Sequence, residues 1–203
     1  MLRRANLSAA INNFVHFELP PWNRVTAAGC LRALAQSHGI QFTDGAETAM
    51  VEKLGICIPY HVQLFFKHVH DGCTRRGNML CDIGDVDAIY REKMLDTSSH
   101  AELSHYEERL KLVFDERDYS LIVDLLTEAA TSPPLRPDAI ARIAEGSAAE
   151  KAAIEVILQT LTHDGYLKET PEGEYVFVSH LLRDWWVSQH GHGYAPIARR
   201  AAR

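Results

Sequence analysis

The sequence predicts a mainly α-helical protein in two parts, a small helical bundle followed by a winged helix-turn-helix domain with one β-hairpin. Apolar residues recur at three- and four-residue spacing along most of the chain, and the period changes to two only near residues 166–179. Glycines and prolines stand where these helical patterns stop and start. With 203 residues, 46% hydrophobic and 24% charged, the composition is typical of a globular protein that is large enough to bury a core.

The first part is predicted to contain three short helices. The first has an apolar face that includes Val25 and Leu31, and the second opens with a capping box formed by Asp44 and Glu47. Proline suits the first position of the third helix because its missing N–H would be unpaired there. The residues after Asp71 indicate a connecting loop that runs to Gly84 and contains Arg75 and Arg76. The predicted starts and ends are Trp22 and Gly39, Asp44 and Gly55, and Pro59 and Gly72.

The second part is predicted to continue with five helices, a hairpin and a last helix. Three helices followed by a hairpin are the layout of a winged helix-turn-helix, with residues 147–163 in the position of the recognition helix. The predicted elements are a helix near 85–95, one capped by Ser99 and Glu102 with Val113 on its inner face, one carrying Tyr119 and Leu126, one from Pro137 to Gly146, one opened by a capping box of Ser147 and Glu150, a hairpin turning at 171–173, and a helix over 181–189. A loose tail follows Gly191.

The charge distribution argues against nucleic acid as the partner of the second part. The net charge is −6, but residues 1–81 hold eight Lys and Arg against five Asp and Glu, whereas residues 100–190 hold eight against seventeen. The recognition-helix segment offers Lys151 against Glu150 and Glu155, so it lacks the cations that neutralise phosphates. A domain that contacts protein, or another part of its own chain, is therefore favoured, and a DNA-binding transcription regulator is the alternative.

The sequence contains no phosphate-binding loop, nucleophile elbow or paired-histidine zinc motif, so no catalytic residues are predicted. The best metal candidate combines His61, His68, His70, Cys73 and Cys81. Their irregular spacing favours surface histidines and buried thiols over a zinc site, and no metal is predicted. Four cysteines without a Cys-x-x-Cys motif and the absence of a long apolar run indicate a cytoplasmic protein with reduced thiols and no membrane segment.

Four short motifs occur in a recognisable order. They are Asn12-Asn13-Phe14-x-x-Phe17-Glu18-Leu19-Pro20-Pro21-Trp22, then Gly55-Ile56-Cys57-Ile58-Pro59-Tyr60-x-x-Gln63, then Tyr106-Glu107-Glu108-Arg109-Leu110, and Ser179-His180-Leu181-Leu182-Arg183-Asp184-Trp185-Trp186. Together they resemble the end of the ATPase core, the helical lid and the winged-helix domain of bacterial AAA-type, STAND-like ATPases. The resemblance implies a core remnant over 1–21, with Val15–Leu19 as a leftover edge strand, a lid over 22–83, a winged helix over 84–190 and a flexible tail over 191–203.

The resemblance also implies a nucleotide site and a role. The lid segment that covers the adenine and ribose corresponds to Gly55, Ile58, Pro59 and Tyr60, and the stretch Pro59-Tyr60-His61 lacks the arginine that many such lids carry. Because the phosphate-binding loop of the family lies upstream of Met1, this chain is expected to bind ATP or ADP only together with that core, and not to hydrolyse ATP alone. The expected partners are the core in cis or another protein, with a homo-oligomer through the lid or the remnant strand as a further possibility. The expected role is to relay the nucleotide state.

Overall fold

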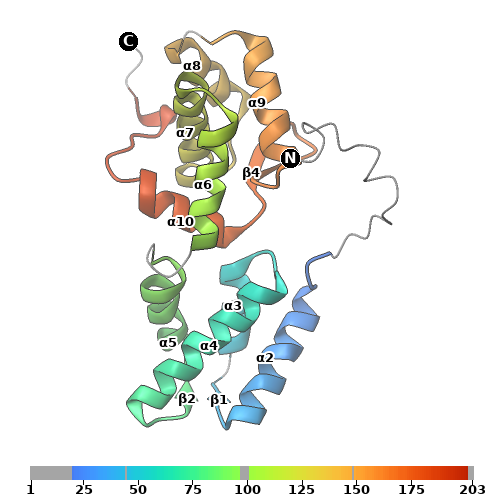
Figure 1. The fold of residues 1–203 in the computed structure, drawn as a ribbon, viewed down its shortest axis with the longest axis vertical. Helices are drawn as coiled ribbons and strands as arrows, with labels where there is room; N and C mark the ends of the chain where they lie inside the picture. The colour runs from blue at the N-terminus through green and yellow to red at the C-terminus, as the bar shows by residue number, and fades with distance from the viewer. Residues whose placement is uncertain (1–19, 44, 97–100, 148, 201–203) are drawn as a thin grey trace.

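The computed structural model describes residues 20–43, 45–96, 101–147 and 149–200. Within these ranges the protein is mainly helical, and Figure 1 shows two helical bundles, which we call the first bundle (residues 20–96) and the second bundle (residues 101–200). The proposed edge strand at Val15–Leu19, the capping residue Asp44 and the cap predicted at Ser99 and Glu102 lie outside the side chains that the structure describes. No helix of the described ranges is both long and apolar enough to cross a bilayer.

The first bundle consists of four α-helices and a short parallel strand pair at its lower end in Figure 1. The α5 helix continues into a π-helical turn at Tyr90–Met94 and packs against α3 and α4. The helix predicted near residue 85 therefore belongs to the first bundle rather than to the second part. The elements are α2 (Arg24–His38), β1 (Gln41–Phe42), α3 (Ala46–Leu54), α4 (Pro59–Arg76), β2 (Leu80–Cys81) and α5 (Ile83–Ile89).

The predicted helix ends at Gly39, Gly55 and Pro59 are confirmed, whereas α2 starts at Arg24, two residues after the predicted Trp22. The side chain of Asn23 accepts a hydrogen bond from the Thr26 N–H at 2.8 Å, so α2 starts with a side-chain cap. At its other end Gly39 adopts a φ of +69°, which suits a residue without Cβ. Pro59 opens α4 as expected, and the predicted apolar face of that helix, which includes Phe65 and Val69, is buried.

Three predictions for the first bundle are wrong. Helix α4 does not end at Gly72 but continues to Arg76, where Gly77 provides the left-handed end. Gly72 instead allows close packing, because a Cβ added there would lie 3.3 Å from the Ile89 side chain. The predicted loop after Asp71 accordingly holds the end of α4, β2 and the start of α5. Val25, expected in the core, is 77% exposed at the start of α2.

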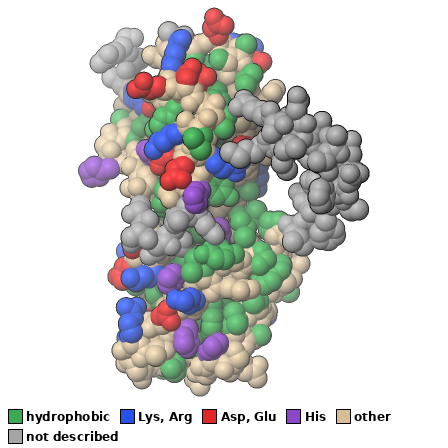
Figure 2. Space-filling model, in the orientation of Figure 1, with side chains coloured by type: hydrophobic (Ala, Val, Ile, Leu, Met, Phe, Trp, Pro, Cys, Tyr) green, Lys and Arg blue, Asp and Glu red, His purple; other side chains and the backbone are tan. Residues whose placement is uncertain are grey.

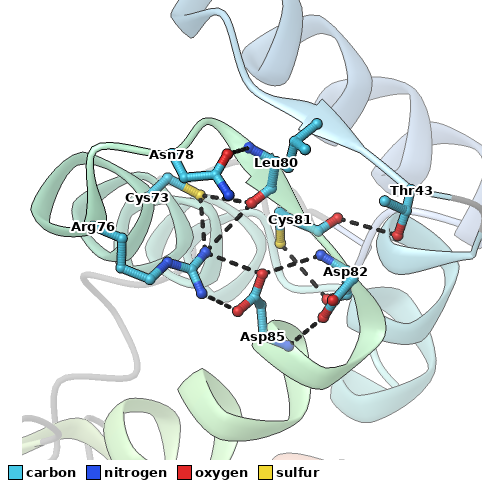
Figure 3. Close-up of polar contacts among 8 residues, drawn as sticks. All are labelled: Thr43, Cys73, Arg76, Asn78, Leu80, Cys81, Asp82 and Asp85. Carbon is cyan, nitrogen blue, oxygen red and sulfur yellow. Dashed lines mark hydrogen bonds and ion pairs between the residues drawn. The ribbon is translucent and has the colours of Figure 1, made fainter.

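Arg76, expected in a solvated loop, is the centre of a polar cluster between α4, β2 and α5 (Figure 3). Its guanidinium makes two contacts with the Asp85 carboxylate and lies 3.4 Å from the carbonyl oxygen of Leu80 and 3.7 Å from Cys73 Sγ. Asp85 also closes a reciprocal capping box with Asp82 at the start of α5. The Arg76 guanidinium lowers the pKa of Asp85. These contacts hold β2 next to the junction of α4 and α5.

The second bundle places α7, α8 and α9 ahead of an antiparallel hairpin, in the predicted order. Leu135, between α7 and α8, exchanges two backbone hydrogen bonds with Tyr175 at 2.8 and 2.9 Å, and so extends the hairpin on its other side. The sequence did not predict this bridge, because a single paired residue produces no periodic pattern of apolar residues in the sequence. The elements are α6 (Ala101–Val113), α7 (Glu116–Thr131), α8 (Pro137–Ser147), α9 (Lys151–His163), β3 (Leu167–Glu169), β4 (Tyr175–Phe177), α10 (His180–His190) and a 3-10 turn (Ile197–Arg199).

The helix starts of the second bundle differ from the sequence pattern at one place. The capping box predicted at Ser147 is wrong, because Ser147 is the last residue of α8 and its hydroxyl donates to the Ala144 carbonyl oxygen at 3.0 Å. Helix α9 starts after Glu150 without a side-chain cap. Val113, predicted to point inward, is 46% exposed. A serine three residues before a glutamate is therefore not sufficient to mark a helix start.

The segment after α10 packs onto α7 rather than forming the loose tail that the sequence predicts. The Glu128 carboxylate on α7 is 3% exposed by residue and accepts hydrogen bonds from the Tyr194 hydroxyl and the Ile197 N–H, both at 2.9 Å. The Ile197 side chain is 4% exposed. One buried carboxylate with two donors thus fixes the chain as far as the 3-10 turn.

Candidate functional site

Helix α10 of the second bundle contacts α3 of the first bundle, and this junction contains the predicted site segment. The His180 ring nitrogen Nδ1 lies 2.9 Å from the carbonyl oxygen of Glu52. The Tyr90 hydroxyl lies 2.9 Å from Asp184 Oδ2 and 3.1 Å from the carbonyl oxygen of Lys53. Burial and the neighbouring Asp184 carboxylate raise the pKa of Tyr90. The phenol therefore stays protonated and donates a hydrogen bond to Asp184 across the junction.

Gly55 is a close backbone contact between the bundles. It ends α3 with φ +70° and ψ −71°, and a Cβ placed on it would lie 2.6 Å from Cγ of the His180 ring. A distance that short is a severe overlap, so a side chain at this position would displace the ring. The glycine therefore both makes the turn and lets α10 approach.

The four predicted site residues lie in one turn between α3 and α4. Gly55 ends α3, Ile58 is the N-cap of α4, Pro59 is its first residue and Tyr60 is 50% exposed. A backbone hydrogen bond from the Trp22 N–H to the carbonyl oxygen of Cys57, 2.9 Å long, holds the start of α2 beside this turn.

The same end of the first bundle exposes apolar surface. Val25, the second residue of α2, is 77% exposed, and Tyr60 follows the turn as the second residue of α4. Figure 2 shows hydrophobic side chains gathered over the first bundle on the face that it presents. An exposed valine and an exposed tyrosine each offer apolar surface on which a flat group such as an aromatic ring can pack.

A basic groove adjoins this turn. It encloses about 350 Å³ and is lined by cations from three separate elements, Arg24 of α2, Lys168 of β3 and Arg183 of α10, together with Gly55 and the His180 ring. None of the described residues that line it is acidic. Its charge therefore favours an anion.

The three cations are not equally free. The Arg183 guanidinium contacts Asp184 Oδ1 at 2.7 and 2.8 Å, which offsets much of its charge. Arg24 and Lys168 are exposed at the groove. Sequence analysis missed all three as a group, because they lie up to about 160 residues apart and no motif joins them.

The predicted metal candidates do not converge in the described part of the chain. No group of three or more His, Cys, Asp or Glu side chains there could hold a metal ion. His70 lies 3.6 Å from Asp71, and Cys73 Sγ lies beside the Arg76 guanidinium. Burial raises the pKa of Cys81 to about 12, so this thiol stays protonated at neutral pH.

Comparison with known proteins gives structural matches only. No family model and no curated protein matches the chain. Two of the matching solved structures are the Thermotoga maritima RuvB Holliday junction branch migration motor, with 18% identity and a TM-score of 0.39 over 78% of this chain, and a point mutant of the same RuvB, with 18% identity and a TM-score of 0.42 over 83% of this chain. The chain spans about half the length of these structures, 47% and 51%. At such TM-scores the likeness carries no conclusion about activity.

Proposed function

We propose that this chain is the lid and winged-helix module of a STAND-like ATPase and that it relays the nucleotide state to a protein partner or to another part of the same polypeptide. One observation carries the proposal: the turn from Gly55 to Tyr60, in which Tyr60 is exposed and Gly55, Ile58 and Pro59 are half-buried, lies beside a basic groove that both bundles line. A nucleotide has the same two parts, a flat apolar base and an anionic phosphate chain.

The contacts suit each half of such a ligand. The base would pack on Ile58, Pro59 and Tyr60, which need no charge to hold it. The phosphates would face Arg24 and Lys168, one from each bundle. Arg24 and Lys168 would then supply the positive charge for the phosphates that the Pro59-Tyr60-His61 stretch lacks.

The shared lining supports a relay. An anion that contacts cations of both bundles binds more tightly when the bundles are close together than when they are apart. A ligand shifts a conformational equilibrium only through such a difference in affinity. The Gly55–His180 contact would pass a displacement of the turn to α10, since the two have no free space between them. The ATPase core that completes the site is proposed to act in cis with this chain.

The test begins with the genomic DNA directly upstream of the Met1 codon, where an in-frame phosphate-binding loop is expected. Hydrogen exchange of the protein translated from that full reading frame would then be compared with ATP, with ADP and without nucleotide. Slower exchange of the amides around Gly55 and Leu182 with one nucleotide supports the proposal. Arg24→Gln with Lys168→Gln should weaken ATP binding at least about tenfold, or about 1.4 kcal/mol. Arg142→Gln, at an exposed arginine of α8 that does not line the groove, is the matched control.

Two results would reject the proposal: an upstream frame without any phosphate-binding loop, or equal exchange at the junction in all three states. The DNA-binding alternative gains no support from the described residues. Lys151 is the one lysine of α9, and the same helix carries Glu155, so α9 has no net positive charge to offer to phosphates. Tight, salt-dependent binding of random duplex DNA would nevertheless restore that alternative.

A further inference from the structure

An apolar groove runs between α8 and α9 on the second bundle, away from the junction. It encloses about 430 Å³, and its walls are Ile140 and Ala144 of α8 and Ile154 and Leu158 of α9. The groove stays open because α8 presents alanines toward it, and Ala141 is exposed on its rim. Larger side chains at these positions would fill the space between the two helices.

The rim of this groove is acidic. Glu145 of α8 and Glu155 of α9 line it, and the one cation of the lining, Lys151, has a 92% exposed side chain that is 3.8 Å from Glu155. An ion pair this exposed is worth little, so it does not hold Lys151 over the opening. The two helices and the turn between them carry more acidic than basic residues. The acidic residues are Asp138, Glu145, Glu150 and Glu155, and the basic residues are Arg142 and Lys151.

We propose that the α8–α9 groove docks one amphipathic helix of a partner protein, which inserts apolar side chains spaced by three and four residues and places Lys or Arg opposite Glu145 and Glu155. Helix-in-groove recognition combines an apolar floor with a charged rim in this way. The groove volume accommodates a few side chains rather than a whole domain. The inference adds the kind of partner to the proposed function but does not depend on nucleotide.

Charge selects this occupant over two others. A second copy of the chain docking through the same face would bring its own Glu145 and Glu155 to the rim, and like charges across an interface are unfavourable. A polyanion would meet the same carboxylates. Of these three occupants, only an amphipathic basic helix makes favourable contacts with both the apolar floor and the acidic rim.

The probe is a fluorescein-labelled 18-residue peptide of leucine and lysine at helical spacing, and its counterpart carries glutamate in place of lysine. Fluorescence anisotropy measures affinity, and NMR shifts locate the site on the full chain. The lysine peptide should bind at least tenfold more tightly than the glutamate peptide and shift the signals of Ala144 and Ile154. Ala141→Arg should weaken binding at least tenfold, whereas Ala33→Arg, at an exposed alanine of α2, should leave it unchanged.

A charge reversal provides the second variant. Glu145→Lys with Glu155→Lys changes only exposed side chains, so it reports on the groove even if Ala141→Arg fails to fold. It should reverse the preference between the two peptides. Equal binding of both peptides, or shifts confined to other surfaces, would overturn the proposal. So would self-association in sedimentation that Ala141→Arg abolishes, which would make a second copy the occupant, or binding of a small apolar dye without binding of either peptide.

Discussion

Gly55→Ala tests the junction directly, because the structure separates the cost of the backbone conformation from the cost of the contact. Gly55 has φ +70°, and its added Cβ would overlap the His180 ring. Gly39 has nearly the same φ, +69°, with nothing within 4 Å of an added Cβ. Gly39→Ala therefore provides a control for an alanine at positive φ without a clash, although ψ is +18° at Gly39 and −71° at Gly55.

The two substitutions should differ in magnitude. A positive φ costs an alanine about 1–2 kcal/mol, part of which is offset by the loss of freedom in the unfolded chain. Gly39→Ala should therefore lower the free energy of unfolding by about 1 kcal/mol. At Gly55 the His180 ring must also move, which breaks its hydrogen bond to Glu52 and adds about 0.5–1.5 kcal/mol for that bond, besides the lost packing. We expect about 3 kcal/mol in total.

Urea unfolding, followed by circular dichroism, measures both values. In a His180→Ala background the overlap is absent, so Gly55→Ala should cost only the backbone conformation, about 1–3 kcal/mol for an alanine with the γ-turn angles of Gly55. The difference between the two backgrounds is the coupling energy of the Gly55–His180 contact. If Gly55→Ala costs the same with and without His180, the ring does not restrict the turn and the mechanical link between the bundles is refuted.

Three further perturbations test other contacts. Tyr90→Phe removes the hydroxyl that joins α5 to α10 and should cost about 1–2 kcal/mol in urea unfolding; a loss below the error of the measurement would contradict the bridge. Glu128→Gln should cost about 1–3 kcal/mol and speed amide exchange near Ile197, since an amide cannot accept both bonds as well as a carboxylate; unchanged exchange there would argue against the contact. The pKa of Asp85 is lowered by Arg76, so their contribution is present above the ordinary Asp pKa of about 3.9 and is lost as pH falls through the lower folded value. Because the Arg76 side chain is 44% exposed, the contribution should be only about 0.5 kcal/mol, and the stability gap between wild type and Arg76→Met should shrink below pH 4. A gap that persists to pH 2 would show that the ion pair is not its source.

Local patterns predicted the helices well because each depends on neighbours in the sequence. The apolar face of α4, the proline at its start and the change of period at the hairpin are all such signals. Gly72 was misread because a glycine inside a helix and a glycine that ends one look alike in sequence. What distinguishes them is the Ile89 side chain, seventeen residues away, which packs closely against Gly72 and would lie 3.3 Å from an added Cβ.

The candidate site was predicted only in part, for the same reason. Gly55 to Tyr60 is one contiguous segment and could be recognised by its residues. The cations Arg24, Lys168 and Arg183 come together only after both bundles have folded and met. Leu135, which pairs with the hairpin, is a single residue hydrogen-bonded to Tyr175, forty residues later in the chain. Such an isolated contact produces no periodic pattern in the sequence.

The contact of Ile197 with Glu128 on α7 determines the shortest fragment of the second bundle that we expect to fold independently. A truncation at His190 would strip two hydrogen-bond donors from the Glu128 carboxylate and remove the buried Ile197 side chain. Any shortened protein, fusion junction or protease site intended for this half should accordingly lie beyond Arg200.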